Sequence, residues 1–213
     1  MRFRFNDRTD AGRRLALVLQ AQPFANPVVL GLPRGGVPVA YEIASALGAP
    51  LDILVVRKVG VPGHEELSMG AVGTGGVFVA NSPLIAQLGI DPRVVEARKN
   101  KAIADLIRLE RDLRGAKQPE PVEGRDVILV DDGLATGSTM RAALAVLETR
   151  RPSRIIVAVP VAPREVCQTL EAETDGLVCL EMPAPFLAVG AWYRSFDQTT
   201  TDEVKKLLDE SRQ

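Results

Sequence analysis

The segment from 127 to 139 holds the side chains with the clearest potential for chemistry. Four aliphatic residues, 127–130, predict a buried strand, and the carboxylates of Asp131 and Asp132 follow it directly. In an open α/β sheet, ligands bind beyond the carboxyl ends of the strands. Two adjacent carboxylates repel each other, so they favour hydrogen-bond donors or a cation as neighbours. Vicinal sugar hydroxyls are one natural partner for such a pair.

A turn of small residues follows the acidic pair and leads into a predicted helix. The free backbone N–H groups and the helix dipole at such a turn suit a phosphate, and the Thr and Ser hydroxyls add donors. Three residues separate Gly133 from Gly137 and no Lys follows, so the turn is not a P-loop, and the chain contains no GxGxxG. From the residues alone, a structural turn with a solvated acidic edge remains the alternative.

Two further segments carry groups that suit an anion. An Arg-Gly-Gly turn at 34–36 follows one predicted strand, and its glycines would let the backbone approach a ligand closely while Arg34 forks onto phosphate oxygens. Arg57 and Lys58 end another predicted strand. Taken alone, a plain turn and a pair of surface charges explain these segments equally well.

Together these segments resemble the type I phosphoribosyltransferases over about residues 27–182, with the strand, acidic pair and turn matching that family's phosphoribosyl pyrophosphate (PRPP) signature. The stretch 61–67 is similar to an uncharacterised bacterial branch of predicted phosphoribosyltransferases. The resemblance implies ribose-binding Asp131 and Asp132; a 5′-phosphate loop of Ala135, Thr136, Gly137, Ser138 and Thr139; and pyrophosphate-binding Arg34, Gly35, Gly36 and Lys58. It also implies a pyrophosphate loop that often contains a non-proline cis peptide, and a flexible loop at 60–71 that closes over the site.

The resemblance implies displacement of pyrophosphate from C1 of PRPP by a nitrogen nucleophile, with Mg²⁺ held chiefly by substrate oxygens. The expected partners are PRPP and an acceptor of unknown identity, such as a nucleobase. Glu65 or Glu66 could meet the incoming nucleophile; His64 could also do so, although a loop histidine is more often merely exposed. Two alternatives stay open: a non-catalytic PRPP-sensing regulatory protein, and a domain that binds another phosphorylated sugar or nucleotide.

Two features bear on the acceptor. Hypoxanthine/guanine enzymes of the family carry an aspartate general base in the phosphate loop, where this chain has Ala135; this resembles the adenine branch and puts 6-oxopurine specificity in doubt. Four of the nine aromatic residues cluster near the carboxyl end, where the family has a variable hood. They could stack a planar acceptor, with Trp192 and Tyr193 as candidates, or form the hood's own small core.

Composition limits the other possibilities. The 213 residues include 26 Lys+Arg and 27 Asp+Glu, a net charge of -1, which gives no electrostatic case for a nucleic-acid or anionic-membrane partner. No apolar run is long enough for a membrane span, and residues 1–10 contain no apolar leader core, so we expect a cytoplasmic protein. Cys167 and Cys179 lack CxxC spacing and are expected to be reduced core residues. A homo-oligomer stays possible.

The elements that must position these groups follow a recurring order of aliphatic run, turn and helix-period segment. This order indicates βαβ units, hence an α/β fold with a mostly parallel sheet flanked by helices and a carboxyl-terminal hood. We expect a single domain over 1–213, with a core at about 25–182 and a hood at about 183–213 plus amino-terminal residues. Strands are predicted at 27–32, 51–56, 127–130, 154–159 and 177–180, and helices at 37–47, 91–114, 138–149, 163–172 and 200–210. Six glycines at 60–81 predict a mobile or hairpin-rich loop.

Overall fold

A five-stranded parallel sheet forms the centre of the computed structural model, which describes residues 4–211 except the side chains of Glu65 and Glu66. The strand order is β2-β1-β6-β7-β8. The strands are β1 (Val28–Gly31), β2 (Leu51–Ile53), β6 (Asp126–Val130), β7 (Arg154–Val161) and β8 (Gly176–Glu181). All four strand pairings are parallel, so the predicted fold class is confirmed.

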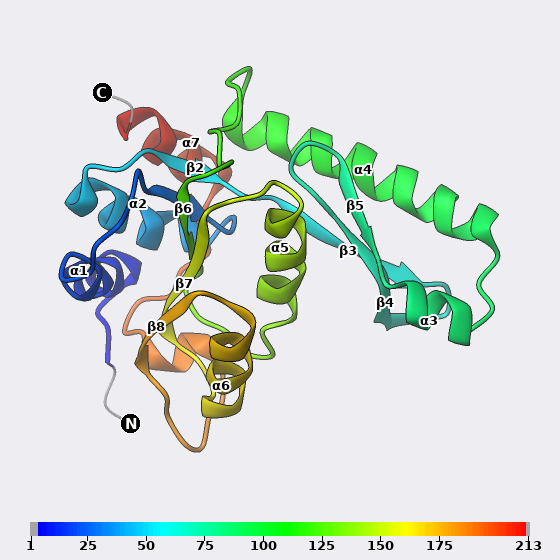
Figure 1. The fold of residues 1–213 in the computed structure, drawn as a ribbon. Coiled ribbons are helices and arrows are strands. Elements are labelled where there is room, and N and C mark those ends of the chain that lie inside the picture. Colours follow the sequence, from blue (N-terminus) through cyan, green and yellow to red (C-terminus); the bar gives the residue numbers. More distant parts are fainter. Residues whose placement is uncertain (1–3, 212–213) are drawn as a thin grey trace.

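Helices cover both faces of this sheet (Figure 1). One face packs against α1 (Arg8–Leu19), α2 (Gly36–Leu47) and α7 (Thr201–Glu210), and the other against α5 (Ser138–Glu148) and α6 (Arg164–Glu173). Successive residues of each strand alternate between the two cores, because side chains in a strand point to opposite faces in turn. The near-continuous aliphatic runs therefore reflect burial on both sides. The free thiol of Cys167 lies in the α5/α6 core.

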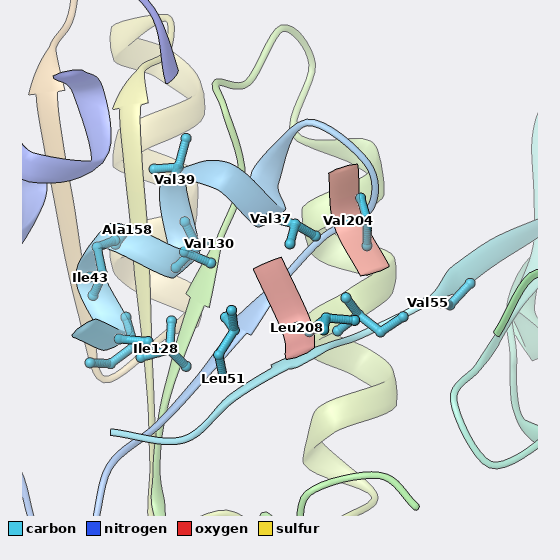
Figure 2. Close-up of a cluster of buried hydrophobic side chains, with 14 of the residues drawn as sticks. Val37, Val39, Ile43, Leu51, Val55, Ile128, Val130, Ala158, Val204 and Leu208 are labelled. Carbon is cyan, nitrogen blue, oxygen red and sulfur yellow. The ribbon is translucent and has the colours of Figure 1, made fainter. Parts of the chain in front are cut away.

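Figure 2 shows the core on the α1/α2/α7 side, where Val204 and Leu208 of α7 join Val37 of α2 and Leu51 of β2. The helix that carries Val204 begins close to the predicted position, because the Thr200 side chain caps it by accepting a hydrogen bond from the Glu203 N–H at 3.1 Å. The carboxyl end of the chain is thus anchored on the sheet.

A second, antiparallel sheet of three strands stands to one side of the first (Figure 1). It consists of β3 (Val56–Val61), β4 (His64–Gly73) and β5 (Val77–Ala80), followed by α3 (Ser82–Gln87) and α4 (Pro92–Arg114). Of the two predictions for the glycine-rich stretch 60–81, a mobile loop or a hairpin-rich one, the structure shows the hairpins. The single strand predicted at 51–56 is wrong: the run divides between β2 and the first residue of β3, which enter different sheets.

Two helices were not expected from the sequence. The six-residue α3 has no fully buried residue, and only Leu84 and Ile85 pack partly against the core, so its apolar pattern is too short to indicate a helix. The amino-terminal α1 buries one face against α2, but its outer face mixes arginines with the exposed Leu17 and Val18, which blurs the amphipathic pattern. The approach of α1 to α2 depends on Gly12, because a Cβ there would lie 2.8 Å from the Val39 carbonyl oxygen. Within residues 4–211, no helix is long and apolar enough to cross a bilayer.

A buried ion pair ties α4 to the edge of the parallel sheet. Arg114 Nε donates to Asp52 Oδ1 at 2.9 Å, and Arg114 Nη2 donates to the Ile53 carbonyl at 2.8 Å. The Glu120 N–H donates to the other Asp52 oxygen at 2.8 Å. The two charged side chains are 4% and 1% exposed. Removing the arginine would take from a buried carboxylate the cation that donates directly to it.

We expect Arg114→Leu to lower the free energy of unfolding by about 3 kcal/mol, because the buried Asp52 carboxylate then loses the charge and the 2.9 Å hydrogen bond of Arg114. Denaturant unfolding measures this. The control is Arg108→Leu in the same helix, whose ion pair with Asp105 is exposed and should contribute less than about 1 kcal/mol. Equal effects of the two substitutions would contradict a special role for the buried pair.

Candidate functional site

Two loops meet at the carboxyl edge of the parallel sheet. Strands β1 and β6 are neighbours in register, with Gly31 opposite Val130, so the residues that follow each strand emerge side by side. The Leu32 N–H continues the pairing by donating to the Val130 carbonyl at 2.8 Å. The Arg-Gly-Gly turn and the acidic pair, which are far apart in the sequence, are therefore adjacent.

The two glycines of the turn are in direct contact with the acidic pair. A Cβ on Gly35 would lie 2.0 Å from Asp132 Oδ2, and a Cβ on Gly36 would lie 2.6 Å from the Val130 carbonyl oxygen. The turn can lie against the end of β6 only because these residues lack side chains. Its Pro33–Arg34 peptide bond is cis, and the Arg34 side chain is exposed.

The carboxylates of the acidic pair are poorly solvated. Burial raises the pKa of Asp131 well above its usual range, and the neighbouring charge of Asp132 raises it further. Burial also raises the pKa of Asp132, against the opposing effect of Arg8. One oxygen of the first carboxylate, Asp131 Oδ1, accepts the Asp132 backbone N–H at 2.9 Å.

Arg8, at the start of α1, reaches the acidic pair and was not expected from the sequence. Its Nε donates to Asp132 Oδ2 at 2.8 Å, and its Nη1 donates to the Asp197 carbonyl at 2.6 Å. The guanidinium also lies 4.0 Å from the centre of the Phe196 ring. No local motif announces such a contact, because its partners lie more than a hundred residues away along the chain.

Aromatic residues from both ends of the chain form a small cluster over this edge. The Tyr193 ring is 2% exposed and lies between Phe5 and Phe196, with centroid distances of 5.3 and 4.8 Å. Burial raises the pKa of Tyr193, so its hydroxyl stays protonated and donates to the Asp132 carbonyl at 2.6 Å. Tyr193 thus belongs to the hood's core and has no free ring face to stack an acceptor. Trp192 is partly exposed, and its buried Nε1 has no hydrogen-bond partner within 4–211.

The predicted phosphate turn lies at the amino end of α5. Gly137 precedes the helix with a φ of 70°, a left-handed conformation that favours glycine, and it offers no side-chain cap to the helix N–H groups. Thr136 Oγ1 donates to Ser138 Oγ at 3.1 Å. Lys58 Nζ of β3 donates to the same Ser138 oxygen at 3.3 Å. Lys58, which the resemblance assigns to pyrophosphate, therefore contacts the predicted phosphate turn in this structure.

A cavity of about 430 Å³ opens beside this turn, between α5 and the antiparallel sheet. Its polar lining includes Lys58, Ser138 and Arg141. Residues 60–71, where the resemblance implies a closing loop, belong to the β3–β4 hairpin, whose turn contains Pro62 and Gly63. His64 is exposed, and the side chains of Glu65 and Glu66 lie outside the described residues.

Along one sheet edge the structure thus brings together two carboxylates, the guanidinium of Arg8, the Arg-Gly-Gly turn and the amino end of α5. The family model of the phosphoribosyl transferase domain matches residues 6–182. The chain belongs to the phosphoribosyl transferase domain family. The match confirms the resemblance drawn from the sequence.

Relatives agree with this membership. A Mycobacterium tuberculosis H37Rv protein named "Putative phosphoribosyl transferase" is 44% identical over 205 residues, which cover 96% of this chain and 46% of the relative. The chain thus spans less than half the length of that relative. The bifunctional protein PyrR of Geobacter sp. M21 is 37% identical over 109 residues, covering 46% and 59% of the two chains. The crystal structure of TT1426 from Thermus thermophilus matches with a TM-score of 0.86 and 44% identity, covering 97% and 98%.

The raised pKa of Asp131 predicts a pH-dependent cost of burying its charge. A carboxyl with a raised folded-state pKa stabilises the fold below its unfolded pKa of about 3.9, and that contribution is lost as the pH rises through the folded value. Asp131→Asn keeps the Oδ1 acceptor without the charge. We therefore expect it to increase the free energy of unfolding at neutral pH, by an amount that shrinks as the pH falls to about 4.

Asp126→Asn is the control of opposite sign. The hydrogen bond from Arg154 lowers the pKa of Asp126, so its contribution to stability is present above the unfolded pKa and is lost as the pH falls. The substitution should therefore destabilise the fold at neutral pH. Denaturant unfolding across the pH range measures both variants, and a destabilising Asp131→Asn at neutral pH would contradict the assigned cost.

Proposed function

We propose that this chain binds Mg²⁺-PRPP and transfers the 5-phosphoribosyl group to a nitrogen nucleophile, releasing pyrophosphate. The observation that carries the proposal is the meeting of two loops at one sheet edge, in a member of the phosphoribosyl transferase domain family: the turn after β1, and the loop after β6 that holds the acidic pair and leads into α5. Each part of these loops offers the chemistry that one part of PRPP requires. The acceptor is a nucleobase or a similar nitrogen compound.

The ribose would lie on the acidic pair, whose carboxylates accept hydrogen bonds from the 2′ and 3′ hydroxyls. The 5′-phosphate would occupy the turn of Ala135, Thr136, Gly137, Ser138 and Thr139, where backbone N–H groups at the start of α5 face an anion. These contacts exist before and during the reaction. They supply binding and positioning rather than selective stabilisation of the transition state.

The leaving pyrophosphate would lie along Arg34, Gly35 and Gly36, with Lys58 between it and the phosphate turn. Negative charge grows on this group as the bond to C1 breaks, so the cations there stabilise the transition state more than the ground state. The oxygen-rich donor set at this edge is of the kind that Mg²⁺ prefers, and the metal, held mainly by substrate oxygens, would neutralise charge on the diphosphate.

Water competes with the acceptor at C1, so the site must be closed during transfer. The β3–β4 hairpin corresponds to the family's closing loop, and its closure would exclude water. Glu65 or Glu66 on that hairpin could then meet the acceptor. Trp192 remains the hood's candidate for acceptor contact, because its ring is partly exposed and its indole N–H lacks a partner in the described chain.

Calorimetric titration with Mg²⁺-PRPP tests the donor half. The wild-type chain should bind, and ligand at about 100 times its Kd should add roughly 2.7 kcal/mol to its stability. The double variant Asp131→Asn/Asp132→Asn should lose binding because its amides cannot replace two anionic acceptors. The matched control Asp202→Asn/Glu203→Gln removes an adjacent acidic pair from α7 and should bind normally. Unchanged binding by the first variant would overturn the ribose assignment.

Pyrophosphate release against a panel of nucleobases and amines then distinguishes transfer from sensing. Release with at least one acceptor supports the transferase. Binding without release for any acceptor would favour the PRPP-sensing alternative.

A second variant tests the contact between the turn and the acidic pair. In Gly35→Ala the new Cβ must displace Asp132 Oδ2, and a displacement on the order of 1 Å should lower kcat/KM by about 100-fold. The control is Gly176→Ala, where a Cβ meets side-chain atoms at an ordinary 3.6 Å and no strain arises. If Gly35→Ala keeps full activity, the turn does not position the carboxylate.

A further inference from the structure

We propose that Arg8 is a positioning residue for the ribose-binding carboxylate, and that it links the order of the hood to occupation of the donor site. The proposal rests on the proposed function, in which Asp131 and Asp132 hold the ribose hydroxyls. It assigns to the amino-terminal segment a role in the donor half of the site.

Three contacts from two parts of the chain, residue 132 and residues 196–197, fix the guanidinium of Arg8. They are the Asp132 carboxylate at 2.8 Å, the Asp197 carbonyl at 2.6 Å and the face of Phe196 at 4.0 Å. The side chains of the ion pair are 13% and 15% exposed. Exposed ion pairs contribute little because water screens them and their side chains stay mobile. A shielded arginine held in this way can impose one orientation on its partner.

The fixed orientation leaves the acidic pair with the acceptors that a vicinal diol needs. Arg8 takes one oxygen of Asp132, Oδ2, and the Asp132 N–H takes one oxygen of Asp131, Oδ1. The other contacts of the pair are internal to it, because the two carboxyl groups lie within hydrogen-bonding distance of each other and the Asp132 N–H also contacts its own carboxylate. A vicinal diol brings two neighbouring hydroxyl donors, which could replace this contact between like-charged groups with one hydroxyl for each carboxylate.

The charge of Arg8 also keeps Asp132 suited to accept. Burial raises the pKa of Asp132, and the hydrogen bond and charge of Arg8 oppose that rise. A protonated carboxyl would turn one acceptor into a donor facing the ribose hydroxyls. The arginine thus favours the anionic form that the proposed contact requires.

The same residue joins the hood to the site. The N–H groups of Arg4 and Phe5 both donate to the Trp192 carbonyl at 3.0 Å, which holds the two ends of the chain together. From the amino-terminal segment, Arg8 donates a hydrogen bond to the Asp132 side chain. From the carboxyl-terminal segment, Tyr193 donates one to the Asp132 backbone carbonyl. A ligand that requires a fixed Asp132 must therefore favour an ordered hood, and the reverse holds by linkage.

The test compares ribose 5-phosphate with 2-deoxyribose 5-phosphate, which lacks one hydroxyl of the diol. Calorimetry gives the Kd of each for the wild type, Arg8→Met, Arg8→Lys and the control Arg14→Met. Arg14 lies on the same helix, pairs with Asp10 at 2.8 Å and lies 5.4 Å over Phe5, so it offers similar contacts away from Asp132. Methionine retains the apolar stem while removing the charge.

We expect the wild type and Arg14→Met to prefer ribose 5-phosphate by roughly 10-fold or more. Arg8→Met should lose most of this preference, while its Kd for 2-deoxyribose 5-phosphate stays close to that of the wild type. Arg8→Lys should recover part of the preference because it restores the charge. Amide hydrogen exchange should show ribose 5-phosphate protecting residues 192–197 in the wild type but not in Arg8→Met.

Each contrary result overturns a definite claim. If Arg8→Met keeps the wild-type preference, or weakens both sugars equally, Arg8 has a merely structural role and the proposal fails. The same follows if Arg14→Met behaves like Arg8→Met. If the wild type itself shows no preference for the diol, the ribose assignment of the acidic pair fails, and this proposal falls with it.

Discussion

Burial of two adjacent carboxylates at the end of β6 is the constraint on which the site depends. Charges of like sign in a poorly solvated place favour protonation, and the raised pKa of Asp131 expresses that tendency. The surrounding structure opposes it with few groups: a backbone N–H for one carboxylate and Arg8 for the other. A ligand that brings hydroxyl donors or a cation would therefore stabilise the two buried carboxylates, and PRPP with Mg²⁺ offers both.

The parallel sheet makes this arrangement possible because it brings the ends of neighbouring strands to one edge. β1 and β6 pair in register, so the loop after one lies against the loop after the other. Two separate cores, one on each face, hold the strands in place. The glycines of the first loop then allow contact at distances that any side chain would prevent.

The sequence predicted what depends on local pattern. Aliphatic runs buried on both faces identified the strands of the parallel sheet, and residue chemistry at their ends identified the acidic pair and the phosphate turn. The run at 51–56 misled because continuous β-forming residues do not reveal where a chain leaves one sheet for another. Arg8 was missed because its contact joins positions 124 residues apart, and one arginine among 26 basic residues carries no positional signal. The two roles offered for Tyr193 could be separated only by its burial.

The same contrast between local patterns and long-range contacts separates the proposed donor half of the site from the proposed acceptor half. The residues that we propose bind the donor lie in short motifs directly after strands, within the 6–182 match to the family model. The carboxyl-terminal part of the hood lies beyond that match, and it is built from segments that meet only in the folded chain. Yet the hood cannot vary independently of the acidic pair, because Arg8 and Tyr193 both donate hydrogen bonds to Asp132. A hood altered to take another acceptor would therefore have to keep these two contacts, or it would disturb Asp132, the carboxylate that we propose binds the ribose.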